Sequence, residues 1–289
     1  MRLKKLCALL LVLAWPAAAR AQCPGCDDDD APRTGGEVVT LGVNALLGGV
    51  TAGVRAWARG GSPQAGFVRG AAGGALVYAG KRIAAEPFDG AGALGRPLAA
   101  VGSSVVYNAG AGRGMLSRVM LPVGPLHVYL EPRGSSPVRV KLDAAATVAA
   151  AYAATRPGAR FRAGESLASS AIVFRRTGPA TGQLRGEQAG GVMTVVYPST
   201  SGEIDTLQVD RIAAHERVHT VQYDQGFLLW AAPAEEWIAG RSPAVRAIHR
   251  YVDFGVNVAA QFAVGAAIPY DARPWEREAY FLSRTRATP

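Results

Sequence analysis

Glycines spaced four residues apart are the feature that most restricts how this chain can fold. They recur at this spacing from Gly66 to Gly74, and again at Gly49 and Gly53 in the preceding apolar segment. In a helix, residues four apart lie on one face, and glycines on that face let a second helix approach closely. We therefore expect residues 37–85 to form a tightly packed helical hairpin joined through the segment ARGGSP.

The apolar character of this hairpin raises the question of a membrane. Arg55, Arg69, Lys81 and Arg82 interrupt the two runs. Neither run offers the roughly 20 clean apolar residues that a spanning helix needs. The pattern favours a soluble or membrane-associated hairpin through residues 37–85, with a pair of spanning helices as the alternative.

The first residues have the features of a targeting segment. Residues 1–21, MRLKKLCALLLVLAWPAAARA, combine a basic start, a short apolar run and small residues at the end. This is typical of a cleaved secretory signal, and the apolar run is too short to cross a bilayer. We expect export to the periplasm or cell envelope. Residues 22–36 are acidic and predict a flexible leader, in which Cys23 and Cys26 could close a small disulfide loop.

The charge balance argues against a nucleic-acid partner. The chain has a net charge of +9, part of which lies in the basic start of the signal segment. The rest contains no basic block with interleaved aromatic residues, which nucleic-acid binding would favour. The excess of arginine is equally compatible with a solvated surface.

The remainder of the chain, residues 86–289, is expected to be one α+β domain. Up to about residue 200, short β-branched or aromatic runs such as PLHVYLEP, PVRVKLD and GGVMTVVYP predict a small, mostly antiparallel sheet. AATVAAAYAATRPG could be a strand or a short helix. Helices are expected from Asp205 to Gly226, over AEEWIAG, over PAVRAIHRYVDFGVNVAAQFAVGAA, and from Pro274 onward.

The segment AAHERVHTVQY contains two of the four histidines. His215 and His219 are four residues apart and share a helix face. A helical projection places a polar stripe on the opposite face, which we expect to meet solvent; it comprises Thr206, Asp210, Arg217, Thr220 and Asp224. Inward histidines need hydrogen bonds or a metal. The His-Glu-x-x-His spacing binds Zn²⁺ in hydrolases, with Glu216 as general base. A satisfied pair of core histidines is the alternative.

A catalytic zinc site also needs a third protein ligand. Glu276 in RPWEREAYFL is the first candidate, because Ala279 on the same helix face would allow close packing against the histidine helix. Glu278 lies on nearly the opposite side, so only one of the two can be a ligand. Glu235 and Glu236 in AEEW are the other candidates. The two further histidines, His127 and His249, are isolated and are expected to be core or surface residues.

HERVHTVQY followed by WEREAY resembles the glutamate-ligand zinc peptidases called gluzincins. More narrowly, it resembles bacterial proteins with His-Glu-x-x-His-x-x-Gln and a later Glu-x-x-Ala helix, including the HtpX-like membrane peptidases. The resemblance covers two short segments and implies a zincin-like C-terminal helical bundle. It also implies Zn²⁺ bound by His215, His219 and Glu276, with Glu216 as base. Tyr280 stands where those peptidases usually have the aspartate that orients a zinc histidine, and Asp224 or Asp253 could substitute for it.

Several residues near the motif have open roles. Gln222 shares the histidine face, where it could bond substrate or a ligand, or serve as a packing amide. Three tyrosines are candidate oxyanion donors or packing aromatics, namely Tyr223, Tyr251 and Tyr280. The strand GGVMTVVYP could bind an extended peptide along its edge.

The sequence therefore predicts an exported zinc-dependent metallohydrolase, most simply a peptidase acting on a peptide or protein. The first alternative is a non-enzymatic envelope or membrane-associated protein in which the metal is structural or absent. Zinc hydrolysis of a non-peptide bond, such as an amide in cell-wall material, is the second alternative.

Overall fold

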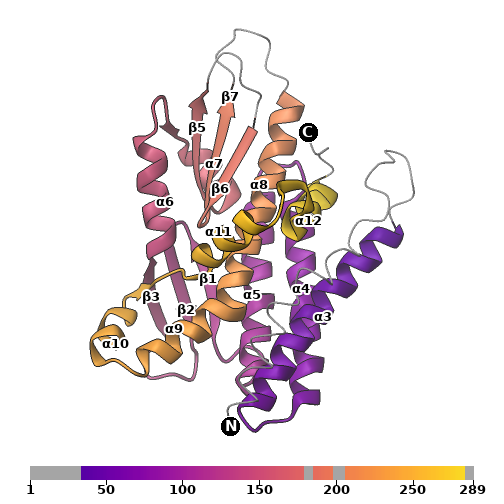
Figure 1. Ribbon diagram of the computed structural model, residues 1–289, viewed down its shortest axis with the longest axis vertical. Coiled ribbons are helices and arrows are strands. Elements are labelled where there is room, and N and C mark those ends of the chain that lie inside the picture. The colour runs from indigo at the N-terminus through magenta and orange to yellow at the C-terminus, as the bar shows by residue number, and fades with distance from the viewer. Residues whose placement is uncertain (1–33, 179–184, 198–205, 284–289) are drawn as a thin grey trace.

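The computed structural model describes residues 34–178, 185–197 and 206–283. Three long helices lie beside two small sheets, and a further helix, α8, runs through the middle (Figure 1). The expected α+β class is confirmed. The expected signal segment, almost all of the leader, the Cys23 and Cys26 pair and the Asp205 helix start fall outside the described residues.

The expected hairpin consists of α3 (Thr34–Ala58) and α4 (Pro63–Ala84). Ser62 caps α4 by accepting a hydrogen bond from the Ala65 amide at 3.2 Å. A Cβ atom added at Gly70 would overlap the backbone of Gly48 on α3, so the spacing indeed serves close helix packing. By length and composition alone α3 could cross a membrane, yet 33% of that segment is buried inside the protein.

A third helix, α5 (Ala91–Gly110), completes this layer, so the expectation of strands from residue 86 is wrong for this segment. The reason is a second glycine face on α4. A Cβ atom at Gly73 would overlap the α5 backbone at Gly102, and one at Gly80 would overlap it at Gly95. The boundary expected between residues 85 and 86 therefore falls inside a three-helix layer.

The strands form two four-stranded sheets instead of one. The first has the order β1-β2-β3-β8, with β1 (Val119–Val123), β2 (Leu126–Leu130), β3 (Val138–Asp143) and β8 (Val252–Asp253). The second has the order β4-β5-β7-β6, with β4 (Arg160–Phe161), β5 (Ile172–Thr177), β7 (Val192–Tyr197) and β6 (Arg185–Ala189). The pairs β3–β8 and β5–β7 are parallel, and the other pairs are antiparallel.

Two short helices interrupt the strands: α6 (Ala144–Thr155) lies between β3 of the first sheet and β4 of the second, and α7 (Ala163–Ser169) lies between β4 and β5 of the second sheet. The segment that could have been a strand is α6, capped by Asp143, which accepts from the Ala146 amide at 3.1 Å. In the second sheet, β7 is paired on both sides, and β4 and β6 are the two edge strands. The expectation that GGVMTVVYP offers a free edge is therefore wrong, because this strand is β7.

The C-terminal part is helical, with different limits from those expected. α8 (Thr206–Gly226) continues past Gly226, which has helical φ and ψ, into a π-helical turn (Phe227–Ala231) and α9 (Ala232–Ala239). The long helix expected afterwards is divided into α10 (Pro243–His249), β8 and α11 (Asn257–Ala267), and Gly255 takes a φ of +68° in the break. A short 3-10 turn (Tyr270–Ala272) then leads to α12 (Pro274–Ser283), which begins at Pro274 as expected.

From Arg217 onward the polar stripe of α8 is buried or half-buried, which corrects the expectation from the helical projection for this part; Asp210, earlier in the stripe, is exposed as expected. Thr220 and Asp224 are fully buried, because α8 is packed between α4, α5, α12 and the strands β6 and β7. Asp224 accepts from the Arg96 guanidinium of α5 at 2.6 and 3.0 Å. Arg217 donates to the carbonyls of Ala84 and Glu86. Partners on neighbouring elements replace the solvent that the projection assumed.

This buried ion pair yields a stability prediction. Asp224→Asn leaves the Arg96 charge without its counter-ion in the core, so we expect the free energy of unfolding to fall by about 3–5 kcal/mol. Urea denaturation followed by circular dichroism measures the change. The control is Asp210→Asn, an exposed aspartate of the same helix, for which a change within about 0.5 kcal/mol is expected. Equal losses in the two variants would contradict the assignment.

Candidate metal centre

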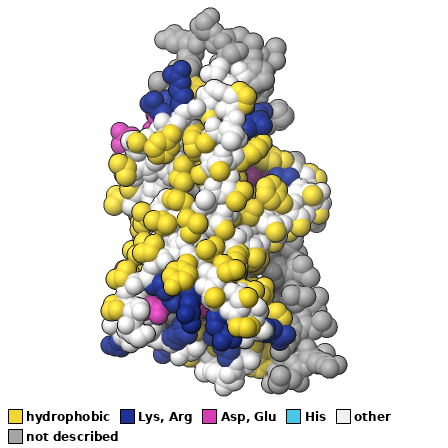
Figure 2. Space-filling view, turned by 90° about the vertical axis from the view of Figure 1, so that its left-hand side faces the viewer, with side chains coloured by type: hydrophobic (Ala, Val, Ile, Leu, Met, Phe, Trp, Pro, Cys, Tyr) yellow, Lys and Arg dark blue, Asp and Glu magenta, His cyan; other side chains and the backbone are white. Residues whose placement is uncertain are grey.

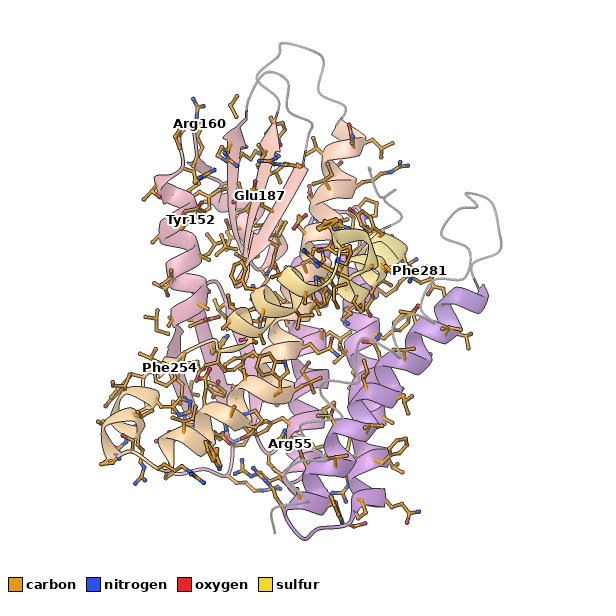
Figure 3. The ribbon with its side chains drawn as sticks, in the orientation of Figure 1. Arg55, Tyr152, Arg160, Glu187, Phe254 and Phe281 are labelled. Atoms are coloured by element: carbon orange, nitrogen blue, oxygen red, sulfur yellow. The ribbon has the colours of Figure 1, made fainter. Side chains whose placement is uncertain are left out.

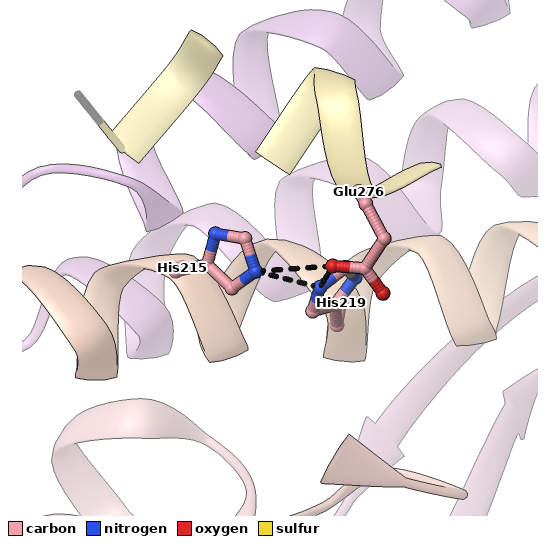
Figure 4. A group of neighbouring side chains, drawn as sticks. All are labelled: His215, His219 and Glu276. Atoms are coloured by element: carbon pink, nitrogen blue, oxygen red, sulfur yellow. Dashed lines mark hydrogen bonds and ion pairs between the residues drawn. The ribbon is translucent and has the colours of Figure 1, made fainter. Parts of the chain in front are cut away.

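Three ligand atoms converge where α12 crosses α8 (Figure 4). Nε2 of His219 lies 2.9 Å from Nε2 of His215 and 3.1 Å from Oε2 of Glu276. The remaining separation, from His215 Nε2 to Glu276 Oε2, is 3.4 Å. The structure thus brings together the two histidines and the first of the candidate carboxylates.

The spacing of these atoms suits a small tetrahedral cation. Zinc bonds of about 2.0–2.1 Å to nitrogen place neighbouring ligand atoms of a tetrahedron about 3.3 Å apart. The three observed separations lie close to that value. Two imidazoles and one carboxylate are also the donor set of many catalytic zinc sites. The residues present therefore fit the metal that the spacing of the motif predicts.

Packing between the two helices sets this geometry. Ala279 of α12 is fully buried against Val218 of α8, together with Ala85 and Leu282. Its small side chain lets the helices approach, and Glu276, one turn earlier on the same face, then reaches the histidines. The side chain of Glu278 lies on a different side of α12, where it contacts Lys81 and Gln222, as its position in the sequence predicts.

Gln222 orients His219. Its Nε2 donates to the Trp275 carbonyl at 3.0 Å and to Glu278 Oε2 at 2.8 Å, so its Oε1 is left to accept from His219 Nδ1 at 2.7 Å. The amide direction follows from this network. Because Nδ1–H is donated to Gln222, His219 turns Nε2 towards His215 and Glu276. Gln222 therefore fixes the orientation of the His219 ring through its Nδ1.

The network continues into the glycine-rich helices, a connection that the sequence did not suggest. Glu278 accepts from Lys81 Nζ at 2.8 Å and from the Asn44 amide at 2.8 Å. Lys81 also donates to Asn44 Oδ1 at 3.0 Å. Burial raises the pKa of Glu278, but the charge of Lys81 together with the hydrogen bonds from Asn44, Lys81 and Gln222 outweighs burial and lowers the pKa below its usual value. An unbroken chain of polar contacts thus joins α3 and α4 to His219.

The aspartates suggested as substitutes lie elsewhere. Asp224 pairs with Arg96, and Asp253 pairs with His127 at 2.8 Å and Lys141 at 2.8 Å. Neither touches a histidine of the centre through a contact in the described part of the chain. Tyr280, which occupies the aspartate position of the motif, packs its ring on His215 with a centroid distance of 4.4 Å.

Glu216 lies beside the centre and beneath the edge strand β6. The residue is only 5% exposed, and a Cβ atom at Gly186 of β6 would overlap its carboxyl group. Burial raises the pKa of Glu216 to about 7, opposed by His219 and assisted by Glu276. A carboxyl group with a pKa near neutrality is suited to accept and return a proton at physiological pH.

The three converging groups shift one another's pKa. Burial lowers the pKa of His215 to about 4. Burial also opposes charge on His219, but the hydrogen bond and charge of Glu276 outweigh it and raise the pKa of His219 to about 9. Against its own burial, the two histidines hold the pKa of Glu276 well below its usual range. Glu276 is therefore a carboxylate, which is the form that binds a cation.

The other candidate carboxylates belong to a separate group beneath the first sheet. Glu235, His249 and Asp253 have atoms close enough to share an ion. However, Lys141 Nζ lies 2.8 Å from Asp253 and 3.4 Å from His249, so an ammonium group already supplies the positive charge. Glu235 accepts from the backbone amides of residues 254–256. Glu236 binds Arg118 at 2.5 Å.

Of the three tyrosines proposed as oxyanion donors, only Tyr280 is at the centre. Tyr223 is buried and donates to Asp143 at 2.8 Å, and Tyr251 is exposed beside β8. Tyr270 also belongs to the site, which the sequence did not indicate. Its hydroxyl lies 3.5 Å from that of Tyr280, and burial, then Tyr280 and Glu276, raise its pKa. Tyr270 lies in the short turn before α12, where no regular residue spacing in the sequence predicts which side chains reach the site.

The role of Gln222 can be tested by its effect on metal affinity. Gln222→Ala removes the acceptor that holds His219 Nδ1, so we expect zinc affinity to fall by about 10–100-fold. Competition with a chelating dye measures it. Gln222→Glu keeps an acceptor at this position and serves as the matched variant, expected to retain more affinity than the alanine variant. Unchanged affinity in Gln222→Ala would show that packing alone orients His219.

Comparison with known protein families, with curated proteins and with solved structures finds no significant match to this chain.

Proposed function

We propose that this protein is a zinc-dependent metallohydrolase, most simply a peptidase, with Glu216 as general base. The convergence of His215, His219 and Glu276 within 3.4 Å supports the proposal most strongly. The buried carboxyl group of Glu216 next to this centre is the second support. The gluzincin-like combination of motif and later glutamate agrees with both.

In this proposal a small group of residues provides the metal ligands, the general base and the hydrogen-bond donors. His215, His219 and Glu276 would hold zinc, which supplies a Lewis acid and lowers the pKa of a water molecule towards about 7. Glu216 would accept a proton from the attacking water and return it to the leaving amine. The hydroxyls of Tyr280 and Tyr270 would donate to negative charge that develops on the substrate carbonyl.

The edge strand β6 is the element of the second sheet nearest this chemistry. Its Gly186 touches the Glu216 carboxyl group, and its outer edge is unpaired within the described sheet. We propose that an extended peptide substrate pairs with β6, in place of the edge expected on β7. We propose that this activity lies in the periplasm or cell envelope, because the sequence of residues 1–21 resembles a secretory signal.

The test is metal-dependent turnover. The purified protein is incubated with a mixed peptide library before and after removal of zinc by a chelator, and cleavage is read by mass spectrometry. We expect cleavage to disappear with the metal and to return when one equivalent of zinc is added. A protein that binds one zinc and cleaves no peptide, with or without added metal, would refute the peptidase.

Burial of the centre favours a second candidate function. His215, His219, Glu216 and Glu276 are each between 5% and 7% exposed. A metal so enclosed would suit a structural role in a non-enzymatic envelope protein. Zinc removal then lowers the unfolding temperature without affecting any cleavage. A structural zinc usually has four protein ligands, whereas three converge here among the residues that the structure describes, and the enzyme is therefore the first choice.

A further inference from the structure

In the first sheet the polar face is buried and the apolar face is exposed, the opposite of the usual arrangement. Alternate residues of a strand point to opposite faces. On one face lie buried polar groups, among them His127, Lys141 and Asp143, which contact Asp253 or lie in the same network beneath the sheet. The other face is entirely apolar, in three cross-strand rows: Val119, Leu130 and Val138; Leu121, Val128 and Val140; and Val123, Leu126, Leu142 and Val252. We call these ten residues the outer sheet face.

The outer sheet face is open. Val138 is 58% exposed, Val123 55% and Val140 48%, while Leu126 and Leu142 are each 37% exposed. An antiparallel sheet with one face on the core normally presents polar residues outward. A contiguous apolar patch of this kind usually marks an interaction site.

The apolar surface extends on to α6, which directly follows β3. Val148 and Tyr152 of α6 are 69% and 61% exposed. Tyr152 lies at the outer margin of the molecule, below Arg160 (Figure 3). Figure 2 looks on to this side and shows hydrophobic side chains across its middle, with lysine and arginine side chains gathered towards both ends.

The charge at both ends of this side is positive. Exposed Arg156 and Arg160 follow α6 at one end, and exposed Arg246 and Arg250 lie at the other, next to β8. The acidic groups here are matched by arginines. Glu131 pairs with Arg118 and Arg139, and Glu165 pairs with Arg162 and Arg175.

We propose that the outer sheet face and the exposed side of α6 dock on an anionic lipid bilayer. Apolar side chains flanked by basic groups match a surface whose headgroups are negative and whose interior is apolar. A second copy of the chain fits less well. In a two-fold contact the same patch meets itself, so the basic ends of one copy would face the basic ends of the other. This surface is distinct from residues 37–85, and the proposal does not depend on the metal centre.

The experiment is vesicle co-sedimentation of the purified protein. Mass spectrometry shows first whether residues 1–21 have been removed, because their apolar run could itself bind vesicles. The vesicles contain either phosphatidylcholine alone or phosphatidylcholine with phosphatidylglycerol. Val138→Glu with Val140→Glu changes the outer sheet face. The matched control is Val68→Glu with Leu94→Glu, two residues that are each 63% exposed on α4 and α5. It adds the same charge and tests the helical surface.

We expect the parent to prefer anionic vesicles, with binding that weakens as salt is raised. The sheet variant should bind at least about tenfold more weakly, and the helix variant like the parent. Val138→Ser with Val140→Ser, which adds no charge, should also weaken binding and serves if the glutamate variant does not fold. A parent that binds neither vesicle, or equal losses in the sheet and helix variants, would overturn the proposal. So would a parent dimer that the sheet variant dissociates, because a second copy would then cover this face.

Discussion

Glu216→Gln is expected to bind zinc like the parent and to lose hydrolysis, with kcat lower by about 10²–10⁴-fold. The amide has nearly the shape of the carboxylate but cannot take a proton from water. Because Glu216 is not among the three converging ligand atoms, the metal should stay. Zinc content by elemental analysis and the rate of peptide cleavage are measured on the same preparation.

The matched control for this variant is Glu187→Gln. Glu187 lies on β6 next to Gly186 (Figure 3), where it is 45% exposed and pairs with Arg176 and Arg185. The Glu187→Gln substitution removes a carboxylate from the same neighbourhood but leaves the buried Glu216 in place. We expect nearly parental rates. If Glu216→Gln cleaved peptides like the parent, or if both variants lost activity alike, Glu216 would not be the base.

Glu276→Ala is expected to release the metal. The variant leaves two imidazoles and no carboxylate, so zinc affinity should fall by more than the roughly 100-fold that loss of a supporting residue causes. Chelator competition gives the affinity, and circular dichroism shows whether the fold is kept. The loss should exceed that of Gln222→Ala, because Glu276 is itself a ligand in this account and Gln222 acts through His219.

Glu187→Ala again serves as the control, since it removes a carboxylate that does not reach the histidines. We expect its zinc affinity to match that of the parent. Tight zinc binding by Glu276→Ala would contradict the assignment of the third ligand. Another carboxylate, or water alone, would then have to complete the centre.

Local patterns in the sequence predicted the parts of this structure that depend on neighbours along the chain. The four-residue glycine spacing predicted the packing of α3 against α4, and Pro274 predicted the start of α12. The spacing of His215 and His219 predicted their shared face, and the small Ala279 predicted the approach of α12. These features rest on helix geometry, which a sequence displays directly.

The errors arose where contacts between distant segments decide the outcome. α5 is helical because its glycines and alanines meet a second face of α4, a face that the hairpin interpretation did not use. The second half of the polar stripe of α8 is buried because Asp224 pairs with Arg96 and because Arg217 donates to carbonyls at and just after the end of α4. Likewise, the hydrogen bonds that link Lys81 through Glu278 and Gln222 to His219 join residues from separate helices. No local spacing in the sequence predicts them.

The most direct test of the metal centre is anomalous diffraction at the zinc absorption edge from crystals grown with zinc. The account predicts one anomalous peak about 2.0–2.2 Å from His215 Nε2, from His219 Nε2 and from a carboxylate oxygen of Glu276. A zinc peak elsewhere, with the two imidazoles still in hydrogen-bond contact and no density between them, would contradict it.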